Sequence, residues 1–373
     1  MAEPTPSKGR RPPTIYDVAR AAGVAASTVS RAFSRPGRVN AETAERIRQV
    51  AADLGYRTNP LARALPTGRT SMLAFVIADI TNPFYGEIIR GAQSAAAEAG
   101  YVILLVDAQE SDRVEREALE RALPTVEGVV LASSRMSDSA IRVIARQRPM
   151  IVLNRHVADV PSVVTDNVHG MRLAVQHLAD QGHRTITYVS GPEASWADGM
   201  RWRSLREESA ELQLRVHRTG PYPPTVAGGT KAAEEFGRHG TSAVIAYNDQ
   251  LAIGLIRGLQ AAGRRVPKDV SVVGFDNIFG AELVTPGLTT VAAPLRAQGY
   301  TAVRDLLSVL GGAHASTGRP VVLPARLVVR GSTAPRGRGR PRPAAVDGPS
   351  PDLPRQDLPV GPCTCGQPGT HRE

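Results

Sequence analysis

The sequence has few of the features that mark secreted or membrane proteins. Its 373 residues include only two cysteines, Cys363 and Cys365, which lie close together near the C-terminus. Such a pair cannot form a disulfide framework, so we expect a reducing compartment such as the cytoplasm. No apolar run approaches the ~18 residues that span a bilayer, and the first residues lack the apolar core of a signal peptide. The sequence therefore predicts no membrane partner.

Motifs of common enzymes are also missing. The chain has no G-x-S-x-G, no H-E-x-x-H, no phosphate-binding G-x-x-x-x-G-K-[ST] and no dinucleotide-binding G-x-G-x-x-G after a strand. Cys363, Cys365 and His371 give three ligands, whereas structural zinc takes four. We expect neither an enzyme nor a metal or other cofactor.

Positive charge is present in excess and is concentrated at the N-terminus. The formal net charge is +10, and residues 1–66 carry 11 Lys and Arg against 5 Asp and Glu. A basic head on a nearly neutral body favours a polyanionic partner such as nucleic acid. Charge alone is equally compatible with a solvated basic surface, so the local pattern has to decide.

Residues 14–54 have the pattern of three short helices. Thr14, with Asp17 three residues later, predicts a capping box for a helix over 15–22, and Gly23 suits the turn that follows. A second helix is predicted over 26–33 and a third over 41–54, with Asn40 as its cap. This spacing predicts a helix-turn-helix, and its small core would consist of Val18, Ala22, Val24, Val29, Ile47 and Val50.

The second of these helices is the one that would enter a major groove of DNA. The side chains facing base edges would be Ala26, Ser27, Thr28, Ser30 and Arg31. A guanidinium can donate two hydrogen bonds to guanine, and hydroxyls suit phosphates or either base. A further short helix is predicted after Asn59, and it is too short to be stable unless it docks on something.

From residue 71 to about 330, short apolar runs alternate with helical stretches, which is typical of βα units around parallel sheets. Strands are predicted at 73–78, 102–106, 128–131, 150–153, 162–165, 185–189, 243–246, 270–274 and 288–291. Helices are predicted between them, including 84–99, 168–181, 250–262 and 294–310. Because nine strands exceed one small sheet, we expect two α/β lobes. From Pro335 onward Pro, Gly and Arg dominate, which predicts a disordered tail.

Two such lobes form a cleft, and ligands bind beyond the carboxyl ends of the strands. The candidate residues there are Asp79, Phe84, Tyr85, Asn154, Trp196, Arg201, Tyr222, Asn248 and Asp276. Arg201 and Asp276 form the preferred pair, because a carboxylate accepts from the two hydroxyls of a diol and a guanidinium donates back. Structural roles stay open as capping for Asn82 and Asp249, and as core packing for Phe275 and Trp202.

Several motifs occur in an order that fits a known family. They are "TIYDVARAAGVAASTVSRAF", "DITNPFYGEIIRGA", "HLADQGHRTITYVSGP", "VIAYNDQLAIGLIRGL", "DVSVVGFDN" and "PGLTTV". Over about residues 14–332 the chain resembles the lac repressor/galactose repressor family. The resemblance implies an α/β protein with an N-terminal all-α helix-turn-helix head and a two-lobed, periplasmic-binding-protein-like (type I) core.

The expected domains follow from the pattern and the resemblance together. Residues 1–13 form an arm, 14–58 the helix-turn-helix, 59–70 a hinge helix and linker, 71–332 the effector-binding core and 333–373 the tail. Within the core, one lobe would take about 71–165 and 293–323, and the other about 166–292 and 324–332.

The resemblance also implies further DNA contacts. Tyr16, Arg38 and Asn59 would touch the backbone or nearby bases, and Arg63 belongs to the hinge helix. Leu65 would wedge between base pairs in the minor groove, where unstacking is offset by extra contact. This chain departs from the family pattern with Ala25 and Ala26 at the start of the second helix, Thr58 before the hinge helix, and Pro66 after the wedge leucine.

The function implied is a transcriptional regulator, expected to be a repressor, that binds a pseudo-palindromic operator as a homodimer. The tail has no leucine heptad, so a coiled-coil tetramer is not expected. A sugar is the favoured small-molecule effector, and a purine, another metabolite or a phosphorylated ligand remains an alternative. A solute-binding protein is the alternative from another class.

Overall fold

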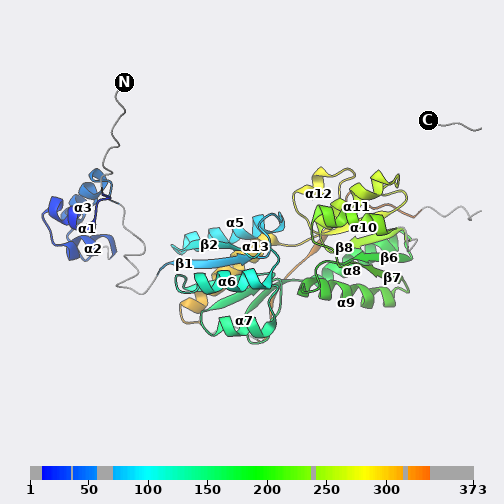
Figure 1. Ribbon diagram of the computed structural model, residues 1–373, viewed down its shortest axis with the longest axis horizontal. Coiled ribbons are helices and arrows are strands. Elements are labelled where there is room, and N and C mark those ends of the chain that lie inside the picture. The colour runs from blue at the N-terminus through cyan, green and yellow to red at the C-terminus, as the bar shows by residue number, and fades with distance from the viewer. Residues whose placement is uncertain (1–10, 35–36, 57–69, 237–240, 314–317, 337–373) are drawn as a thin grey trace, which may run out of the picture. The chain divides into compact units, whose positions relative to one another are not determined.

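The computed structural model describes residues 11–34, 37–56, 70–236, 241–313 and 318–336. These residues form a helical N-terminal region and two β-sheets flanked by helices (Figure 1). The predicted hinge residues Asn59, Arg63, Leu65 and Pro66 lie outside the described residues, as does the tail from residue 337 onward.

The N-terminal region contains the three predicted helices, α1 (Ile15–Ala22), α2 (Ala26–Ser34) and α3 (Ala41–Asp53). The Asp17 carboxylate accepts hydrogen bonds from the Thr14 N–H (2.8 Å) and the Thr14 hydroxyl (2.7 Å) at the start of α1. Gly23 ends α1 with φ +66°, a conformation that a side chain would resist. The predicted core is confirmed, with Val18, Val29 and Ile47 fully buried among these helices.

The first lobe is built on a six-stranded parallel sheet. Its order is β11-β5-β4-β3-β1-β2, and its strands are β1 (Met72–Ile77), β2 (Val102–Asp107), β3 (Gly128–Ala132), β4 (Met150–Leu153), β5 (Ser162–Thr165) and β11 (Val321–Leu323). Phe75 of β1 packs towards α5 (Phe84–Glu98) and α13 (Leu295–Leu310). Val76 packs in the cluster on α6 (Asp112–Ala122) and α7 (Asp138–Ala145), so helices cover both faces of the sheet.

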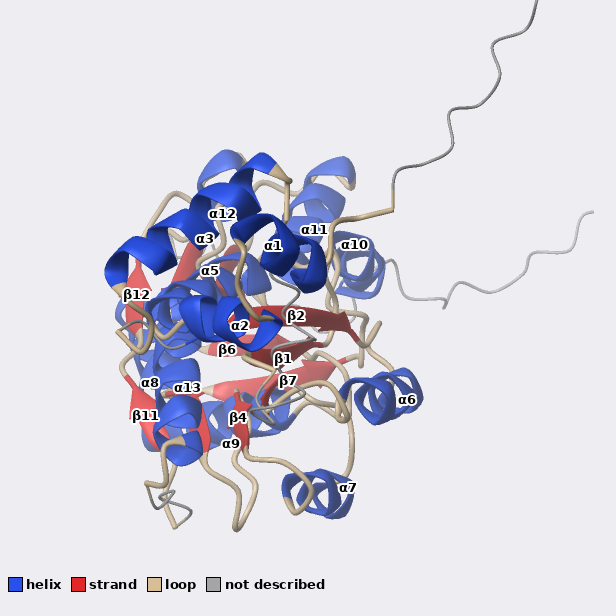
Figure 2. Ribbon diagram, turned by 90° about the vertical axis from the view of Figure 1, so that its left-hand side faces the viewer, coloured by secondary structure: helices blue, strands red, loops and turns tan. Residues whose placement is uncertain are grey.

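The second lobe repeats this arrangement in the order β12-β10-β9-β8-β6-β7. Its strands are β6 (Thr185–Val189), β7 (Arg215–Thr219), β8 (Ala243–Ala246), β9 (Ser271–Asp276), β10 (Thr289–Ala292) and β12 (Arg326–Val328), and β12 alone among them runs antiparallel to its neighbour. The helices around them are α8 (Asn167–Asp180), α9 (Trp196–Glu211), α10 (Val226–Glu235), α11 (Asp249–Ala261) and α12 (Gly280–Leu283). Figure 2 shows helices around the strands of both sheets.

Close packing of α10 against α11 depends on glycine. A Cβ atom on Gly229 would lie 2.1 Å from the Leu251 carbonyl oxygen and 2.9 Å from the Gly254 Cα atom. Only a residue without a side chain lets the two helix backbones approach this closely. These helices cover β8 and β9, whose carboxyl ends carry several candidate site residues.

All nine predicted strands are confirmed to within two residues at each end, but three strands were missed. Strand β7 is a half-exposed edge strand of mostly polar residues, and β11 and β12 have three residues each, so none has a long apolar run. The chain passes between the two sheets after β5, after β10 and between β11 and β12. Neither sheet is therefore made from one continuous piece of chain.

Residues 333–336 are a correction to the predicted tail, because they are bonded to the second lobe. The Ala334 N–H donates to the Ser271 hydroxyl (3.1 Å), and the Arg336 N–H donates to the Gln181 carbonyl (2.8 Å). The buried His183 ring contacts Ser271 and the Ala334 carbonyl oxygen through Nε2. These small polar residues carry no apolar signal, so composition could not show that they are held by hydrogen bonds.

None of the helices in the described part of the chain combines the length and apolarity that crossing a bilayer requires. Within the same residues, no three His, Cys, Asp or Glu side chains are grouped so that they could hold a metal ion.

Candidate ligand-binding pocket and DNA-binding head

A pocket lies where strand ends of the first lobe meet strand ends of the second. Its lining comprises Asn82, Phe84, Tyr85, Glu110, Ser133, Arg135 and Asn154 from the first lobe, with Ala197, Arg201, Pro224, Tyr247, Asn248 and Asp276 from the second. The space among them, part of which is open to solvent, is about 370 Å³. Six of the nine predicted effector-binding residues meet here, namely Phe84, Tyr85, Asn154, Arg201, Asn248 and Asp276.

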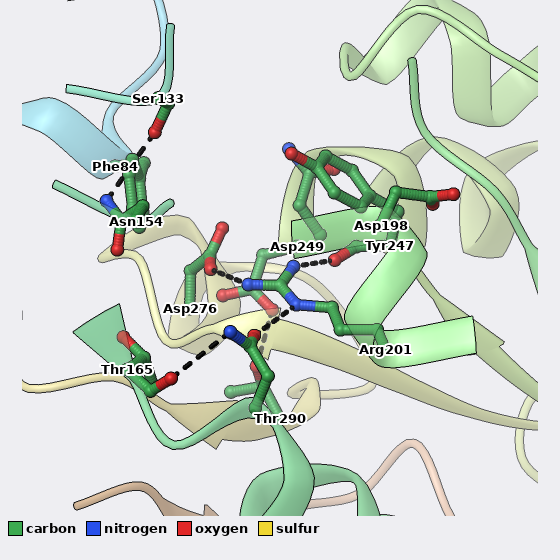
Figure 3. A network of polar contacts seen from close by, with 12 residues as sticks. Phe84, Ser133, Asn154, Thr165, Asp198, Arg201, Tyr247, Asp249, Asp276 and Thr290 are labelled. Carbon is green, nitrogen blue, oxygen red and sulfur yellow. Dashed lines mark hydrogen bonds and ion pairs between the residues drawn. The ribbon is translucent and has the colours of Figure 1, made fainter. Parts of the chain in front are cut away.

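Arg201, on α9, is the most constrained side chain of the pocket (Figure 3). It is only 6% exposed, its Nε donates to the Asn167 side-chain oxygen (2.9 Å), and Nη1 donates to the Tyr247 carbonyl oxygen. Its guanidinium carbon lies 3.5 Å from the centre of the Phe275 ring. Burial, hydrogen bonds and this cation–π contact fix the guanidinium in one orientation, as a binding group requires.

Asp276, at the end of β9, faces Arg201. Arg201 Nη2 donates to Asp276 Oδ1 at 3.4 Å, a long contact that leaves both groups able to bind a third partner. Burial raises the pKa of Asp276 to about 7, although the Arg201 charge lowers it. Asp276 also has φ +109°, which is uncommon for a residue with a side chain and often marks a functional site.

Behind this pair, Asp249 has a structural role, which is one of the two roles that the sequence left open for it. It is fully buried, and its carboxylate accepts from the Thr290 hydroxyl (2.5 Å) and the Ile278 N–H (2.8 Å). Burial, and then the nearby charge of Asp276, raise the pKa of Asp249 well above its usual value. Asp249 thus fixes the strand ends around Asp276 without lining the pocket.

Asn248 combines two roles. Its side-chain oxygen accepts from the Leu251 N–H (2.9 Å) and so caps α11, while its amide nitrogen donates to the Pro224 carbonyl (3.2 Å). Asn82 is similar, because it accepts from the Phe84 N–H (3.1 Å) at the start of α5 and also lines the pocket.

The other two structural alternatives are confirmed. Phe275 is fully buried below Arg201, and Trp202 stacks on Tyr188 with 5.9 Å between ring centres. Neither ring lines the pocket formed by the described residues.

Three predicted effector-binding residues do not reach the pocket lining within the described chain. The Asp79 carboxylate closes a turn by accepting from the Thr81 N–H (2.8 Å) and hydroxyl (2.7 Å). The Trp196 side chain packs on the core of the second lobe. Tyr222 is buried, and its hydroxyl contacts Glu235 (2.5 Å). All three residues lie near strand ends, but local hydrogen bonds and core packing direct their side chains away from the pocket.

The sequence reasoning missed Glu110, Ser133, Arg135 and Tyr247. Each follows the end of a predicted strand, so the rule that selected Asn154 and Asp276 would also have selected them. Arg135 Nε donates to Glu110 Oε2 at 2.6 Å, which gives the first lobe a partly buried ion pair of its own. The pocket therefore contains two guanidinium groups and two carboxyl groups, one pair on each wall.

The N-terminal helices expose the face that would meet DNA. On α2, Ser27, Ser30 and Arg31 are exposed while Val29 is buried, and Ala26 and Thr28 are half-buried. Tyr16 is 69% exposed, which is unusual for so large a ring in a small core, and Arg38 is exposed as well. The predicted contact residues of the described head thus lie at its surface.

A helix-turn-helix with an exposed basic and hydroxyl-bearing face, on the same chain as two α/β lobes with a polar pocket, defines a ligand-responsive DNA-binding regulator. Comparisons with known proteins agree. Residues 14–59 match "Bacterial regulatory proteins, lacI family", and residues 175–333 match "Periplasmic binding protein-like domain". The HTH-type transcriptional regulator DegA of Bacillus subtilis is 32% identical over 332 residues, which cover 86% of this chain and 98% of DegA.

Solved structures show the same similarity over the whole fold. The lac repressor dimer bound to operator and the anti-inducer ONPF superimposes with a TM-score of 0.78 at 26% identity, covering 87% of this chain and all of the other. The regulator CelR in complex with cellobiose has a TM-score of 0.64 at 30% identity, with 86% and 99% covered. This chain belongs to the lacI family of bacterial transcriptional regulators.

Proposed function

We propose that the protein is a cytoplasmic repressor that binds a pseudo-palindromic operator as a homodimer, and that a sugar in the pocket controls its affinity for DNA. The buried Arg201–Asp276 pair carries this proposal. A vicinal diol can donate to the carboxylate and accept from the guanidinium, so the pair suits a polyhydroxylated ligand. CelR, which shares the fold, is known in complex with cellobiose.

The charges of the pocket also favour a sugar. A phosphorylated ligand is best held by several cationic groups, whereas here each guanidinium has a carboxyl partner. Neutral hydroxyl groups can use both members of each pair. Phe84 and Tyr85, whose rings meet edge to face, offer apolar surface for the C–H groups of a sugar ring.

Exposed apolar side chains support a dimer. In the first lobe Val102 and Leu105 of β2 are 63% and 37% exposed, and Ile80, which follows β1, is 55% exposed. In the second lobe Phe279 and Leu283 of the α12 region are 72% and 74% exposed. Burying a large apolar side chain contributes about 1.5–3 kcal/mol, so covering these residues with a second subunit is favourable. The lac repressor, which shares the fold, binds its operator as a dimer.

Control of DNA binding would come from ligand-dependent closure of the two lobes. The effect of the ligand cannot exceed its differential affinity for the two states, typically about 1–3 kcal/mol, or a 5- to 150-fold change in operator affinity. The hinge helix with Leu65 is the proposed connection between the lobes and the head.

The deciding experiment is binding of the purified protein to DNA upstream of its own and neighbouring genes, with and without a panel of sugars. We expect salt-sensitive binding to one palindrome and a change of affinity with one sugar. Asp276→Asn should bind the same operator and lose the response to the sugar. If the wild-type protein shows no preference for any duplex over random competitor, the proposal fails. If Asp276→Asn responds normally, the ligand binds elsewhere.

A further inference from the structure

The pocket holds a second ion pair, Glu110 with Arg135, on the wall opposite Arg201 and Asp276. We infer that this pair binds the far end of the ligand through neighbouring hydroxyls and restricts the ligand to uncharged sugars, excluding sugar acids and sugar phosphates. The inference rests on the proposed function and adds to it a second recognition element and the charge class of the ligand.

Arg135 has unused binding capacity. Its side chain is 7% exposed and lines the pocket, and its Nε donates to Glu110 Oε2 at 2.6 Å. Among the described residues, its two terminal nitrogens make no hydrogen bond to a protein acceptor. A guanidinium has five N–H donors, so the N–H groups of these nitrogens are available to a ligand.

Hydrogen bonds from neighbouring side chains hold the backbone around Arg135. The Glu115 carboxylate, 1% exposed, accepts from the Arg135 N–H (3.1 Å). Arg155 Nη1 donates to the carbonyl oxygens of Ser134 (3.1 Å) and Met136 (2.6 Å), on either side of Arg135. The loop is thus fixed by a buried carboxylate and a half-buried guanidinium, which preorganise Arg135 towards the pocket.

Strained backbone occurs at the same strand ends. Glu110 follows β2 with φ +57°, Ser133 follows β3 with φ +56°, and Asn154 follows β4 with φ +58°. Three strands of the first lobe, of which β3 and β4 are neighbours, therefore each place a non-glycine residue with a left-handed backbone at the pocket. Such residues persist where the surrounding structure holds them, and they cluster at ligand sites.

The carboxylate of Glu110 determines the charge class. A diol can donate one hydroxyl to Glu110 and accept at the other from Arg135, so both members of the pair are satisfied. A ligand carboxylate or phosphate that reached Arg135 would lie beside Glu110, because the two side chains are 2.6 Å apart, and the like charges would repel in a buried site. The pair therefore rejects anions that an isolated arginine would attract.

The two ion pairs together explain how one ligand could hold both lobes. Arg135 of the first lobe and Tyr247 of the second lobe both line the pocket, so the two walls of the pocket are close. A small sugar with hydroxyls at both ends would contact Glu110 and Arg135 on one lobe and Arg201 and Asp276 on the other. Binding at the first-lobe pair is then part of the lobe closure that reaches the DNA-binding head.

The test uses the full-length dimer and isothermal titration with named probes: D-ribose, D-glucose, D-galactose, cellobiose, D-gluconate and D-glucose 6-phosphate. We expect a neutral sugar to bind, and Glu110→Gln to weaken it about tenfold. Gln retains an acceptor for Arg135 Nε, so the ligand-free melting temperature should stay close to wild type. Glu117→Gln on the exposed face of α6, the same chemical change outside the pocket, should leave the affinity unchanged.

Binding of an anion to the wild type overturns the inference. If the wild type binds gluconate or glucose 6-phosphate as tightly as a neutral sugar, and Glu110→Gln does not tighten that binding, Glu110 does not exclude anions. If no neutral sugar binds, or if Glu110→Gln binds it as wild type does, the pair is not a recognition element. Operator binding measured on the same samples separates the two claims. Specific duplex binding in these cases leaves the proposed operator recognition standing, whereas its absence in the wild type refutes the proposed function instead.

Discussion

Protonation of Asp276 should make sugar binding depend on pH near neutrality. Burial raises the pKa of this carboxyl to about 7, against the lowering effect of Arg201, so the acid is neutral in about nine of ten molecules at pH 6 and in about one of ten at pH 8. The carboxyl of Asp276 must be ionised to accept hydrogen bonds from both hydroxyls of a diol. The dissociation constant of the neutral sugar should therefore rise about tenfold from pH 8 to pH 6 and about another tenfold by pH 5.

The effect of Asp276 on the pH dependence has to be distinguished from that of the charged groups around it. Arg201 on α9 and Asp249 on α11 face Asp276, and burial raises the pKa of Asp249 well above its usual value. Both residues are retained in Asp276→Asn, so this variant separates their contribution from that of Asp276. Isothermal titration of the wild type and Asp276→Asn at pH 5, 6, 7 and 8 measures the effect. The variant should bind weakly with a flat profile. A flat profile in the wild type, or an unchanged slope in Asp276→Asn, would refute the reasoning.

Four shorter predictions concern other parts of the molecule. Gly229→Ala should lower the unfolding free energy by about 1–3 kcal/mol in urea titrations, because its Cβ would meet the backbone of α11, whereas Gly86→Ala, with open space, should not. Phe279→Asp should shift the protein to monomer in light scattering and weaken operator binding; a dimer of normal mass would remove this surface from the interface. Leu65→Ala should weaken operator binding with the sugar affinity intact, and unchanged operator binding would exclude a wedge. Burial lowers the pKa of His183, so the wild type should lose stability as pH falls below about 6.5, and His183→Gln should lose less over the same range.

The fold was largely predictable because its strands are buried on both faces. Such strands appear in the sequence as uninterrupted apolar runs, and "MIVL" at 150–153 is predicted with its exact ends. Strand β7 was not predicted because an edge strand needs no apolar run, and its alternation of Arg, His and Thr resembles a loop. Segments of three residues such as β11 acquire their structure from the strand they pair with, which local sequence cannot specify.

The site was predictable in position but not in detail. The rule that ligands bind at the carboxyl ends of strands selected Arg201 and Asp276, because their chemistry is distinctive. The same rule selected Tyr222, which is not among the described residues that line the pocket, since a sequence does not show that its hydroxyl bonds to Glu235. Arg135 was missed because its importance comes from Glu110, 25 residues away, and only the fold brings the two together.

The way the chain alternates between its two sheets has a consequence for synthesis in the cell. Strand β11 completes the first sheet and β12 the second, so neither sheet is complete before residues 321–328 have been synthesised. Until the ribosome has released these residues, each lobe exposes a sheet edge that lacks its last strand. For the same reason, no contiguous fragment of the chain contains all the strands of one lobe and none of the other. A premature stop codon near position 320 would therefore damage both halves at once, leaving the helix-turn-helix as the part of a truncated product with all its described elements.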